Sequence, residues 1–132
     1  MVEKQSGCEI MPTITYDKKD LLNLIGEKLS DEQLEEVIHS MKTNVEDKND
    51  NEITIELTPD RSDLFGIEGL ARAIKQYLGL QNGLKKFTVD SPKLHVRASR
   101  LPYRPYLAAA VVRNVSMTDA FIKSLMNIQD VL

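Results

Sequence analysis

The sequence is poor in the residues that build several common kinds of functional site. Among its 132 residues there are no tryptophans, one cysteine and two histidines, and aromatic side chains make up only 5%. The single cysteine, Cys8, cannot form a disulfide within the chain, which fits a reducing compartment and predicts a cytoplasmic protein. His39 and His95 lie far apart and have no partners at the spacing of a metal-ligand set, so we expect no metal site.

Long hydrophobic runs are also absent. No stretch approaches the roughly 20 apolar residues of a membrane-spanning helix, and the leader Met1–Glu9 lacks the apolar core of a secretory signal. There is no glycine-rich phosphate loop, no dinucleotide-binding fingerprint and no G-x-S-x-G nucleophile motif. The sequence therefore argues against membrane insertion, secretion and self-sufficient ATP or hydrolase chemistry, and we assign no catalytic residue and no cofactor to it.

Apolar residues at 42% and charged residues at 28% are typical of a folded soluble domain. The net charge is only −3, but acidic and basic residues are concentrated in different parts of the chain. The acidic group is Glu46, Asp47, Asp50, Glu52, Glu56 and Asp60. The later basic group is Lys85, Lys86, Lys93, Arg97, Arg100, Arg104 and Arg113. All of the basic group except Arg113 are candidates for contact with RNA phosphates, although a solvated edge with scattered Lys and Arg is the commoner explanation.

Three elements are predicted in the first third of the chain: a strand over residues 12–16 and helices over 18–27 and 31–41. The strand contains β-branched residues after a proline, and Asp17 can cap the first helix. Ser30 and Gln33 form a capping-box pattern ahead of the second helix. Two short helices in tandem are therefore expected to follow the strand.

The middle of the chain predicts a hairpin and then a longer helix. The turn-rich Asn49-Asp50-Asn51 separates residues 43–47 from the alternating residues 52–58. The helix is predicted over residues 63–78 from the apolar residues that recur on one helical face, which are Leu64, Ile67, Ala71, Ile74 and Leu78.

The segment Pro59-Asp60-Arg61-Ser62-Asp63 lies where the second hairpin strand meets this helix. Any of Asp60, Ser62 and Asp63 could cap the helix, Pro59 would stiffen the turn, and Arg61 could pair with a neighbouring carboxylate. We favour this structural role over catalysis.

The last third is less regular. One or two strands are predicted near residues 85–89 and 93–98. The apolar run over 106–113 would suit a buried helix as well, because of its three alanines, but a strand is preferred because a proline precedes it. An amphipathic helix is predicted from Thr118 to Leu132 without a stop signal. A two-sided strand and an uncapped helix need more chain to cover them, which indicates a piece of a longer protein. The change from acidic to basic composition near Leu80 is the best candidate for a domain boundary.

Several motifs together resemble one family. Residues 11–22 are similar to the opening of archaeal and eukaryotic phenylalanyl-tRNA synthetase beta subunits, for which Met11 would be the usual start. Residues 59–64 and 67–73 resemble the family's Pro-(Asp/Asn)-Arg-x-Asp-Leu and Glu-Gly-Leu-Ala-Arg-Ala signature. The signature residues with expected structural roles are Pro59, Asp60, Arg61, Asp63, Glu68, Gly69 and Arg72.

Residues 104–113 and 122–129 resemble the segment that leads into the family's editing-associated domain, so the resemblance covers about residues 11–132. It departs from the family pattern at Thr58, where Asn is frequent, and at Phe65-Gly66, where Leu-Ser or Leu-Cys is frequent. A glycine at position 66 would loosen the first turn of the helix.

The resemblance implies a cytoplasmic heterotetramer of two alpha and two beta chains that joins phenylalanine to tRNA(Phe) with ATP and magnesium. In the family the aminoacylation site lies in the alpha subunit, and the editing pocket and the beta-subunit magnesium ligands lie beyond the position of Leu132. No residue of this chain inherits an active-site role, and the implied role is that of an assembly module.

We therefore expect an α+β fold in which a small antiparallel sheet packs against about three helices, followed by the start of a second, truncated domain. The predicted organisation is a flexible leader (1–10), an N-terminal domain (11–80), and linker strands with the beginning of the editing-associated domain (81–132). Two alternatives stay open: a stand-alone nucleic-acid-binding module with a winged-helix-like fold, and a free-standing protein-interaction module. The acidic hairpin argues against the first, because it would repel phosphates.

Overall fold

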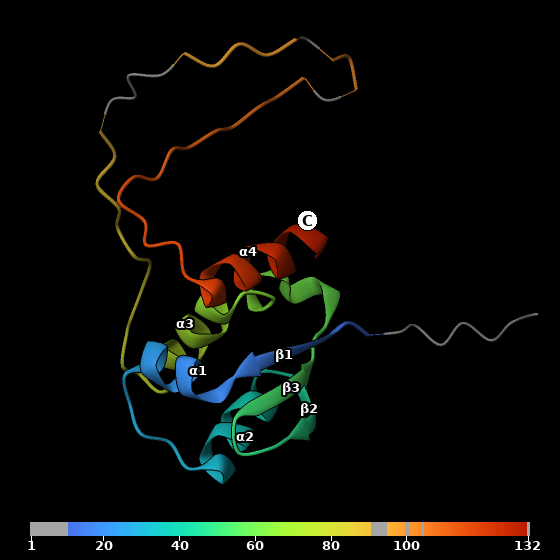
Figure 1. Ribbon diagram of the computed structural model, residues 1–132, viewed down its shortest axis with the longest axis vertical. Coiled ribbons are helices and arrows are strands. Elements are labelled where there is room, and N and C mark those ends of the chain that lie inside the picture. The colour runs from blue at the N-terminus through green and yellow to red at the C-terminus, as the bar shows by residue number, and fades with distance from the viewer. Residues whose placement is uncertain (1–10, 91–94, 100, 104, 132) are drawn as a thin grey trace, which may run out of the picture. The chain divides into compact units, whose positions relative to one another are not determined.

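The computed structural model describes residues 11–90, 95–99, 101–103 and 105–131 (Figure 1). The chain divides into two units. One unit is formed by the chain up to Gly83 together with the segment from Thr118 onward, and the other by Leu84–Met117. The predicted domain limits at residues 10 and 80 stay predictions.

A three-stranded antiparallel sheet organises the first unit. Its strands are β1 (Thr13–Asp17), β2 (Asn44–Lys48) and β3 (Glu52–Glu56), arranged in the order β1-β3-β2. β3 therefore lies in the centre, and its Ile53 and Ile55 are fully buried. The predicted hairpin is confirmed, with a bulge between Val45 and Asp47 that interrupts the register on the edge strand.

Two helices connect β1 to β2. Helix α1 (Lys18–Ile25) starts at Asp17, whose Oδ1 accepts a hydrogen bond from the Asp20 amide at 2.7 Å, and ends at Gly26 with φ = 79°. Helix α2 (Asp31–Ser40) starts with a complete capping box between Ser30 and Gln33. Both helices start where the sequence predicts them, whereas α1 ends at Ile25 instead of residue 27 and α2 at Ser40 instead of residue 41.

The single helix predicted over residues 63–78 is replaced by two elements. A 3₁₀ segment, η1 (Pro59–Leu64), is followed by helix α3 (Ile67–Tyr77), and Gly66 between them has extended dihedrals of φ = −92° and ψ = 140°. Residues 63–66 therefore do not form the first turn of α3. The prediction was wrong there because the apolar spacing from Leu64 to Ile67 fits a 3₁₀ turn and an α-helix equally well.

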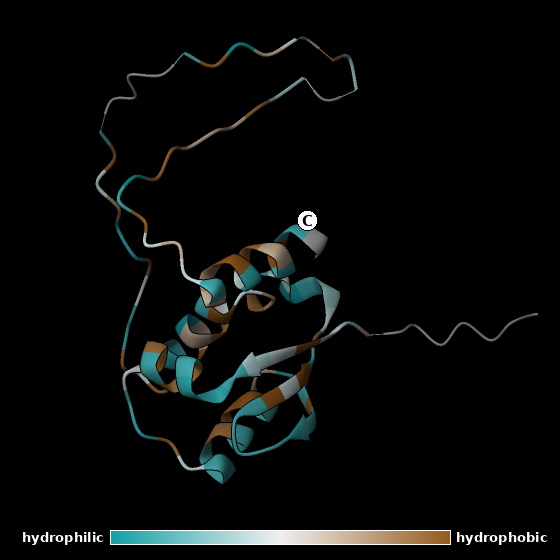
Figure 2. Cartoon of the chain, viewed as in Figure 1, coloured by the Kyte–Doolittle hydropathy of each residue, from teal (hydrophilic) through white to brown (hydrophobic). Residues whose placement is uncertain are grey.

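The core of this unit is formed by one face of each element. Helices α1 and α3 pack on each other, α2 contacts β2 and α3, and helix α4 (Asp119–Val131) contacts η1. Figure 2 shows brown and teal bands alternating along these helices, as expected of elements with one apolar face. The buried apolar residues are Tyr16, Leu21, Ile25, Leu34, Val37, Ile38, Ile53, Ile55, Leu57, Leu64, Phe65, Ile67, Leu70, Ala71 and Ile74. The predicted α+β fold class is confirmed.

The second unit, Leu84–Met117, contains no helix or strand among its described residues. The strands predicted over 85–89 and 106–113 are not formed, nor is the part of strand 93–98 that the structure describes; residues 93 and 94 lie outside the described residues. Exposed apolar side chains such as Phe87, Tyr106 and Val112 account for the error, because they create a strand-like pattern in the absence of a partner strand.

Candidate functional site

The segment that the sequence singles out, Pro59–Asp63, folds into η1 between β3 and α3. Within it, Arg61 donates two hydrogen bonds to Asp63, from Nε to Oδ1 at 2.9 Å and from Nη2 to Oδ2 at 3.1 Å. Arg72, one turn into α3, reaches the same carboxylate at 3.7 Å. The predicted pairing of Arg61 is confirmed, and Asp63 is the centre of an arginine clamp that joins η1 to α3.

The electrostatics of this clamp hold both partners in their charged forms. The hydrogen bond from Arg61 lowers the pKa of Asp63, and the same bond raises the pKa of Arg61. Neither group is therefore prepared to exchange a proton near neutral pH. Arg61 also has dihedrals of φ = −113° and ψ = 55°, outside the helical region, so the backbone of η1 is kinked at this residue.

The capping role predicted for Asp60, Ser62 or Asp63 is wrong. Helix α3 starts after Gly66, and neither Gly66 nor Thr58, the residue before η1, makes a side-chain cap. The reason is positional, because all three candidates belong to the 3₁₀ segment and precede the first turn of α3. Pro59 does occupy the first turn of η1, where its fixed φ is favourable.

Glycines allow close contacts on both sides of this junction. A Cβ placed on Gly69 would overlap the backbone carbonyl oxygen of Asp63, so α3 can approach η1 only with glycine at this position. A Cβ on Gly66 would lie 2.7 Å from Cδ1 of Ile128 and 3.2 Å from Oγ of Ser124. Gly66 therefore gives α4 room to pack, a role that the sequence did not reveal.

Helix α4 is also linked to this region by a polar contact. Ser124 is 4% exposed, and its hydroxyl donates a hydrogen bond to the Glu68 carboxylate on α3. Of the signature residues, Glu68 thus connects α3 to α4, and Arg72 connects α3 to η1.

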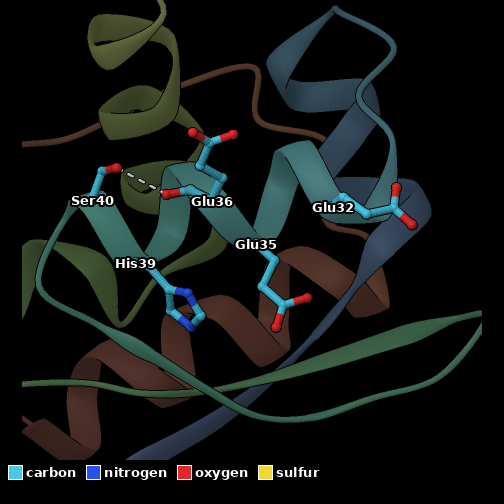
Figure 3. A pocket seen from close by; sticks show the side chains of 5 residues that line it. All are labelled: Glu32, Glu35, Glu36, His39 and Ser40. Carbon is cyan, nitrogen blue, oxygen red and sulfur yellow. Dashed lines mark hydrogen bonds between the residues drawn. The ribbon is translucent and has the colours of Figure 1, made fainter.

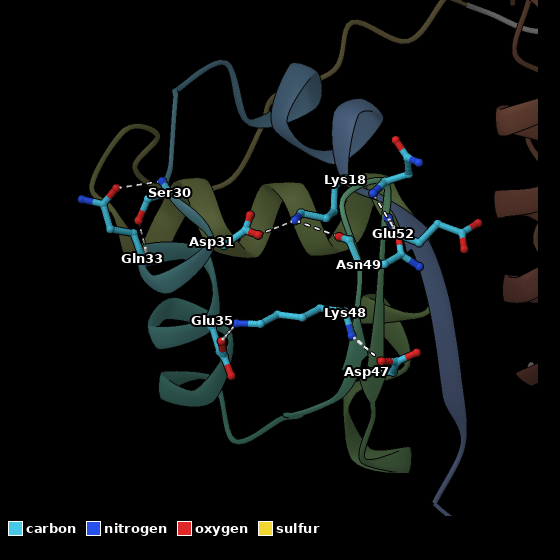
Figure 4. A network of polar contacts seen from close by, with 10 residues as sticks. Lys18, Ser30, Asp31, Gln33, Glu35, Asp47, Lys48, Asn49 and Glu52 are labelled. Atoms are coloured by element: carbon cyan, nitrogen blue, oxygen red, sulfur yellow. Dashed lines mark hydrogen bonds and ion pairs between the residues drawn. The ribbon is translucent and has the colours of Figure 1, made fainter.

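Two further polar contacts were not predicted from the sequence. The buried Tyr16 on β1 donates its hydroxyl to the carbonyl of Leu64 at 2.7 Å, and burial raises the pKa of this tyrosine. Lys18, whose side chain is 8% exposed, bonds to Asp31 at 2.7 Å and to the carbonyl of Asn49 at 3.1 Å (Figure 4). It joins the starts of α1 and α2 to the hairpin turn, and its hydrogen bond lowers the pKa of Asp31.

The outer face of α2 forms a shallow hollow that contains Glu32, Glu35, Glu36, His39 and Ser40 (Figure 3). Two of these polar groups already have partners: the Ser40 hydroxyl donates to the Glu36 carbonyl at 2.9 Å, and Lys48 pairs with Glu35. Figure 3 shows Glu36 and Glu35 pointing away from each other. Among the described residues, no three His, Cys, Asp or Glu side chains are grouped so that they could hold a metal ion.

The candidate RNA contacts all belong to the second unit. Lys85, Lys86 and Arg97 are exposed there, and Lys85 Nζ lies 5.4 Å from the ring centre of Phe87. The other three candidates, Lys93, Arg100 and Arg104, lie outside the described residues, as does Cys8. None of the described helices combines the length and apolar character needed to cross a bilayer.

Comparison with known proteins gives a consistent set of relatives. No family model matches the chain. It is 40% identical over 124 residues to "Phenylalanine--tRNA ligase beta subunit" of Methanocella arvoryzae, which covers 92% of this chain and 22% of that protein. The protein of the same name from Methanocaldococcus jannaschii is 36% identical over 126 residues, covering 92% of this chain and 23% of that protein.

A solved structure has the same fold. It is an N-terminal fragment of the phenylalanyl-tRNA synthetase beta subunit from Pyrococcus horikoshii, with a TM-score of 0.55 and 32% identity, covering 62% of this chain and 25% of that one. The present chain thus spans about a quarter of the length of the relatives that it matches. On this shared sequence and fold, the chain is similar to the N-terminal region of archaeal phenylalanine--tRNA ligase beta subunits.

Proposed function

We propose that this chain is a non-catalytic structural and assembly module of a phenylalanine--tRNA ligase beta subunit. The observation that carries the proposal is that four of the five charged signature residues, all except Asp60, make internal contacts. Arg61 and Arg72 hold Asp63, and Glu68 holds Ser124 of α4. Side chains engaged in this way fix the positions of η1, α3 and α4 relative to one another.

In this proposal the activity belongs to a larger assembly. The whole enzyme is a cytoplasmic heterotetramer of two alpha and two beta subunits that attaches phenylalanine to tRNA(Phe) with ATP and magnesium. The chain spans only 22–23% of two of its relatives, which leaves most of a beta subunit to carry other functions. The charged states of Asp63 and Arg61 support a scaffold role, because a general acid or base needs a pKa near the working pH.

The protein-interaction alternative has one observation in its favour. Helix α4 packs through Ser124 and its neighbours but exposes three apolar side chains: Ile122 (41%), Leu125 (46%) and Met126 (57%). The winged-helix-like alternative would bring the β2–β3 hairpin and α2 against nucleic-acid phosphates. Most charged side chains of both elements are carboxylates, which would repel the phosphates. A partner protein therefore suits this unit better than nucleic acid does.

The test uses the complete alpha and beta subunits with substitutions in the clamp. Asp63→Asn and Arg61→Gln should lower the temperature at which the heterotetramer dissociates, whereas kcat and KM for phenylalanine at a permissive temperature should stay within about twofold. Light scattering would report the assembly, and charging of tRNA would report the activity. Asp60→Asn is the matched control, because the structure gives Asp60 no ion pair within the described residues.

Two results would contradict the proposal. A hundredfold or larger loss of kcat in an intact tetramer would assign the clamp a catalytic role. Failure of the tagged beta subunit to copurify with the alpha subunit at about 150 mM salt, where weak phosphate contacts are partly screened, would rule out assembly with the alpha subunit.

A further inference from the structure

The junction between the two units contains an asparagine followed by a glycine, Asn82-Gly83. The second unit begins at the next residue, Leu84. The chain has seven asparagines, and each of the other six is followed by a residue with a side chain: Leu24, Val45, Asp50, Glu52, Val115 or Ile128. Asn82 is therefore the one asparagine in the sequence whose following amide nitrogen has no Cβ beside it.

The fold does not hold this dipeptide in a regular hydrogen-bonding pattern. The amides of Leu80 and Gln81 both donate to the Lys75 carbonyl near the end of α3, at 2.9 and 3.3 Å. Asn82 and Gly83 are exposed and lie outside helix and strand. Among the described residues, neither of their amides donates to a carbonyl, and a long 3.4 Å bond from a glutamine of α3 is the contact made by the Gly83 carbonyl. The backbone can therefore rotate here at little cost.

The local geometry also leaves room for a reaction between the two residues. Gly83 has φ = 74°, and a Cβ placed on it would meet nothing within 4 Å, so the space around it is open. A bond between the Gly83 nitrogen and Cγ of Asn82 would close a five-membered ring. Because the two groups belong to adjacent residues, they meet at the high effective concentration of an intramolecular reaction.

We propose that Asn82 is a site of spontaneous deamidation through a cyclic imide. The Gly83 amide nitrogen loses its proton to solvent and forms a bond to Cγ of Asn82. The bond from Cγ to Nδ2 breaks, and the leaving nitrogen takes up a proton and departs as ammonia. Water then opens the ring. Breakage of the new bond to Cγ gives aspartate, and breakage of the original peptide bond gives isoaspartate.

The reaction alters the charge and the length of the junction. Both products carry a carboxylate in place of a neutral amide, so the net charge changes from −3 to −4. The new charge follows Gln81, which is bonded to the C-terminal end of α3, where the helix dipole disfavours an anion. Isoaspartate also adds one carbon to the backbone between the two units. The proposal goes beyond the assembly role and does not rest on it.

The test incubates the 132-residue chain at about 37 °C and about pH 8 and follows the tryptic peptide 76–85, in which Asn82 is the only asparagine. A mass gain of about 1 Da should appear there at least about tenfold faster than at any other asparagine. The gain should be slower at about pH 6, because the deprotonated amide is the nucleophile. A methyltransferase specific for isoaspartyl carboxylates should label the same peptide, since direct hydrolysis of the side chain would give aspartate alone.

The Asn82→Gln variant should slow the mass gain at least about tenfold, because glutamine would have to close a six-membered ring. Asn51→Gln, at an exposed turn position, is the matched control and should leave the rate within about twofold. The synthetic peptide 76–85 reports the reaction without the fold, and the chain should react within about threefold of its rate. A chain that reacts more slowly than that, a product without isoaspartate, or an equal mass gain at another asparagine would overturn the proposal.

Discussion

Gly69 is the residue of the signature with the least freedom to change. Alanine normally stabilises the interior of a helix by about 1 kcal/mol relative to glycine. At this position, however, a Cβ would overlap the carbonyl oxygen of Asp63, which belongs to the backbone and cannot rotate away. The family resemblance predicts a structural role for Gly69. The structure shows this role, which is to leave room for the carbonyl oxygen of Asp63.

We therefore predict that Gly69→Ala destabilises the protein despite its favourable helix propensity. The expected loss in the free energy of unfolding is about 1–3 kcal/mol, as for other overpacked sites. Urea denaturation followed by circular dichroism would measure it. Gln76→Ala, at an exposed position of the same helix, should change stability by less than about 0.5 kcal/mol. A gain in stability from Gly69→Ala would show that η1 and α3 are less closely packed than the structure indicates.

Asp63 should make part of the stability depend on acid pH. Its pKa is lowered in the folded protein by Arg61, so its stabilising contribution is complete above the unfolded pKa of about 3.9 and is lost as the pH falls through the lowered folded value. Because both partners are partly exposed, the contribution should be about 0.5–1 kcal/mol.

Asp63→Asn should thus lower the free energy of unfolding at pH 7, and the difference from the unsubstituted chain should shrink at pH 3. Urea denaturation at the two pH values gives this comparison, with Asp60→Asn as the control. An equal difference at both pH values would mean that Asp63 acts through packing or hydrogen bonds rather than through its charge.

Contacts between single residues could be predicted only when the partners are close in sequence. The pair of Arg61 and Asp63 could be read from the sequence because two positions separate its members. The Tyr16 bond to Leu64 spans 48 positions, and the Lys18 bond to Asp31 spans 13. Such bonds depend on where β1 and α1 pack, and local spacing carries no information about that.

At the scale of elements, local capping chemistry determines where α2 begins. The Ser30 hydroxyl accepts from the Gln33 amide at 3.3 Å, and the Gln33 side chain accepts from the Ser30 amide at 3.0 Å. We predict that Ser30→Ala lowers the free energy of unfolding by about 1 kcal/mol, because the Gln33 amide loses the hydroxyl that accepts its hydrogen bond. Ser40→Ala at the other end of α2 should lower the free energy of unfolding by less. The Ser40 hydroxyl donates to the Glu36 carbonyl, and its removal leaves no backbone amide without an acceptor. Equal losses in urea denaturation would contradict a special role for the cap.

Helix α4 offers a test of packing between elements. We predict that Gly66→Val displaces α4, because the new side chain would occupy the space of the Ile128 tip. The substitution should lower the free energy of opening α4 by about 1–2 kcal/mol. Amide hydrogen exchange in α4 should then be roughly tenfold faster, with little change in α3. Valine is preferable to alanine because Ile128 could rotate away from one methyl group.

The double variant provides the control for this experiment. On an Ile128→Ala background the space beside position 66 is already open, so adding Gly66→Val should have a smaller effect than it has alone. Additive effects of the two substitutions would show that Gly66 and Ile128 do not meet in solution.

Elements with local signals were predicted correctly, whereas elements that depend on distant partners were not. The starts of α1 and α2, the hairpin and α4 follow from caps, turn residues and periodicity within a few positions. Strands at 85–89 and 106–113 were predicted from apolar content, but a strand forms only when another strand supplies its hydrogen bonds. No such strand is available to them among the described residues, and their backbone is irregular.

At the scale of the whole molecule, charge and secondary structure change together. The first unit contains every described helix and strand and is acidic. The described part of the second has irregular backbone and carries the exposed side chains of Lys85, Lys86, Arg97 and Arg113. Backbone without regular hydrogen bonds opens at little cost, whereas the sheet and helices of the first unit open only with loss of the core.

Trypsin should therefore separate the two units, because it cuts after lysine and arginine in backbone that can enter its active site. We predict first cuts after Lys85, Lys86, Arg97 or Arg113, which are exposed, and slow cuts after the buried Lys18. Mass spectrometry of a brief digest would identify the sites, and a digest in urea, where all sites should react at similar rates, is the control. The fragment that ends at Lys85 or Lys86 should keep a cooperative thermal transition, since it retains β1 to α3 and nearly all of the buried core. First cuts between β1 and α3 would mean that this unit is not a stable body by itself.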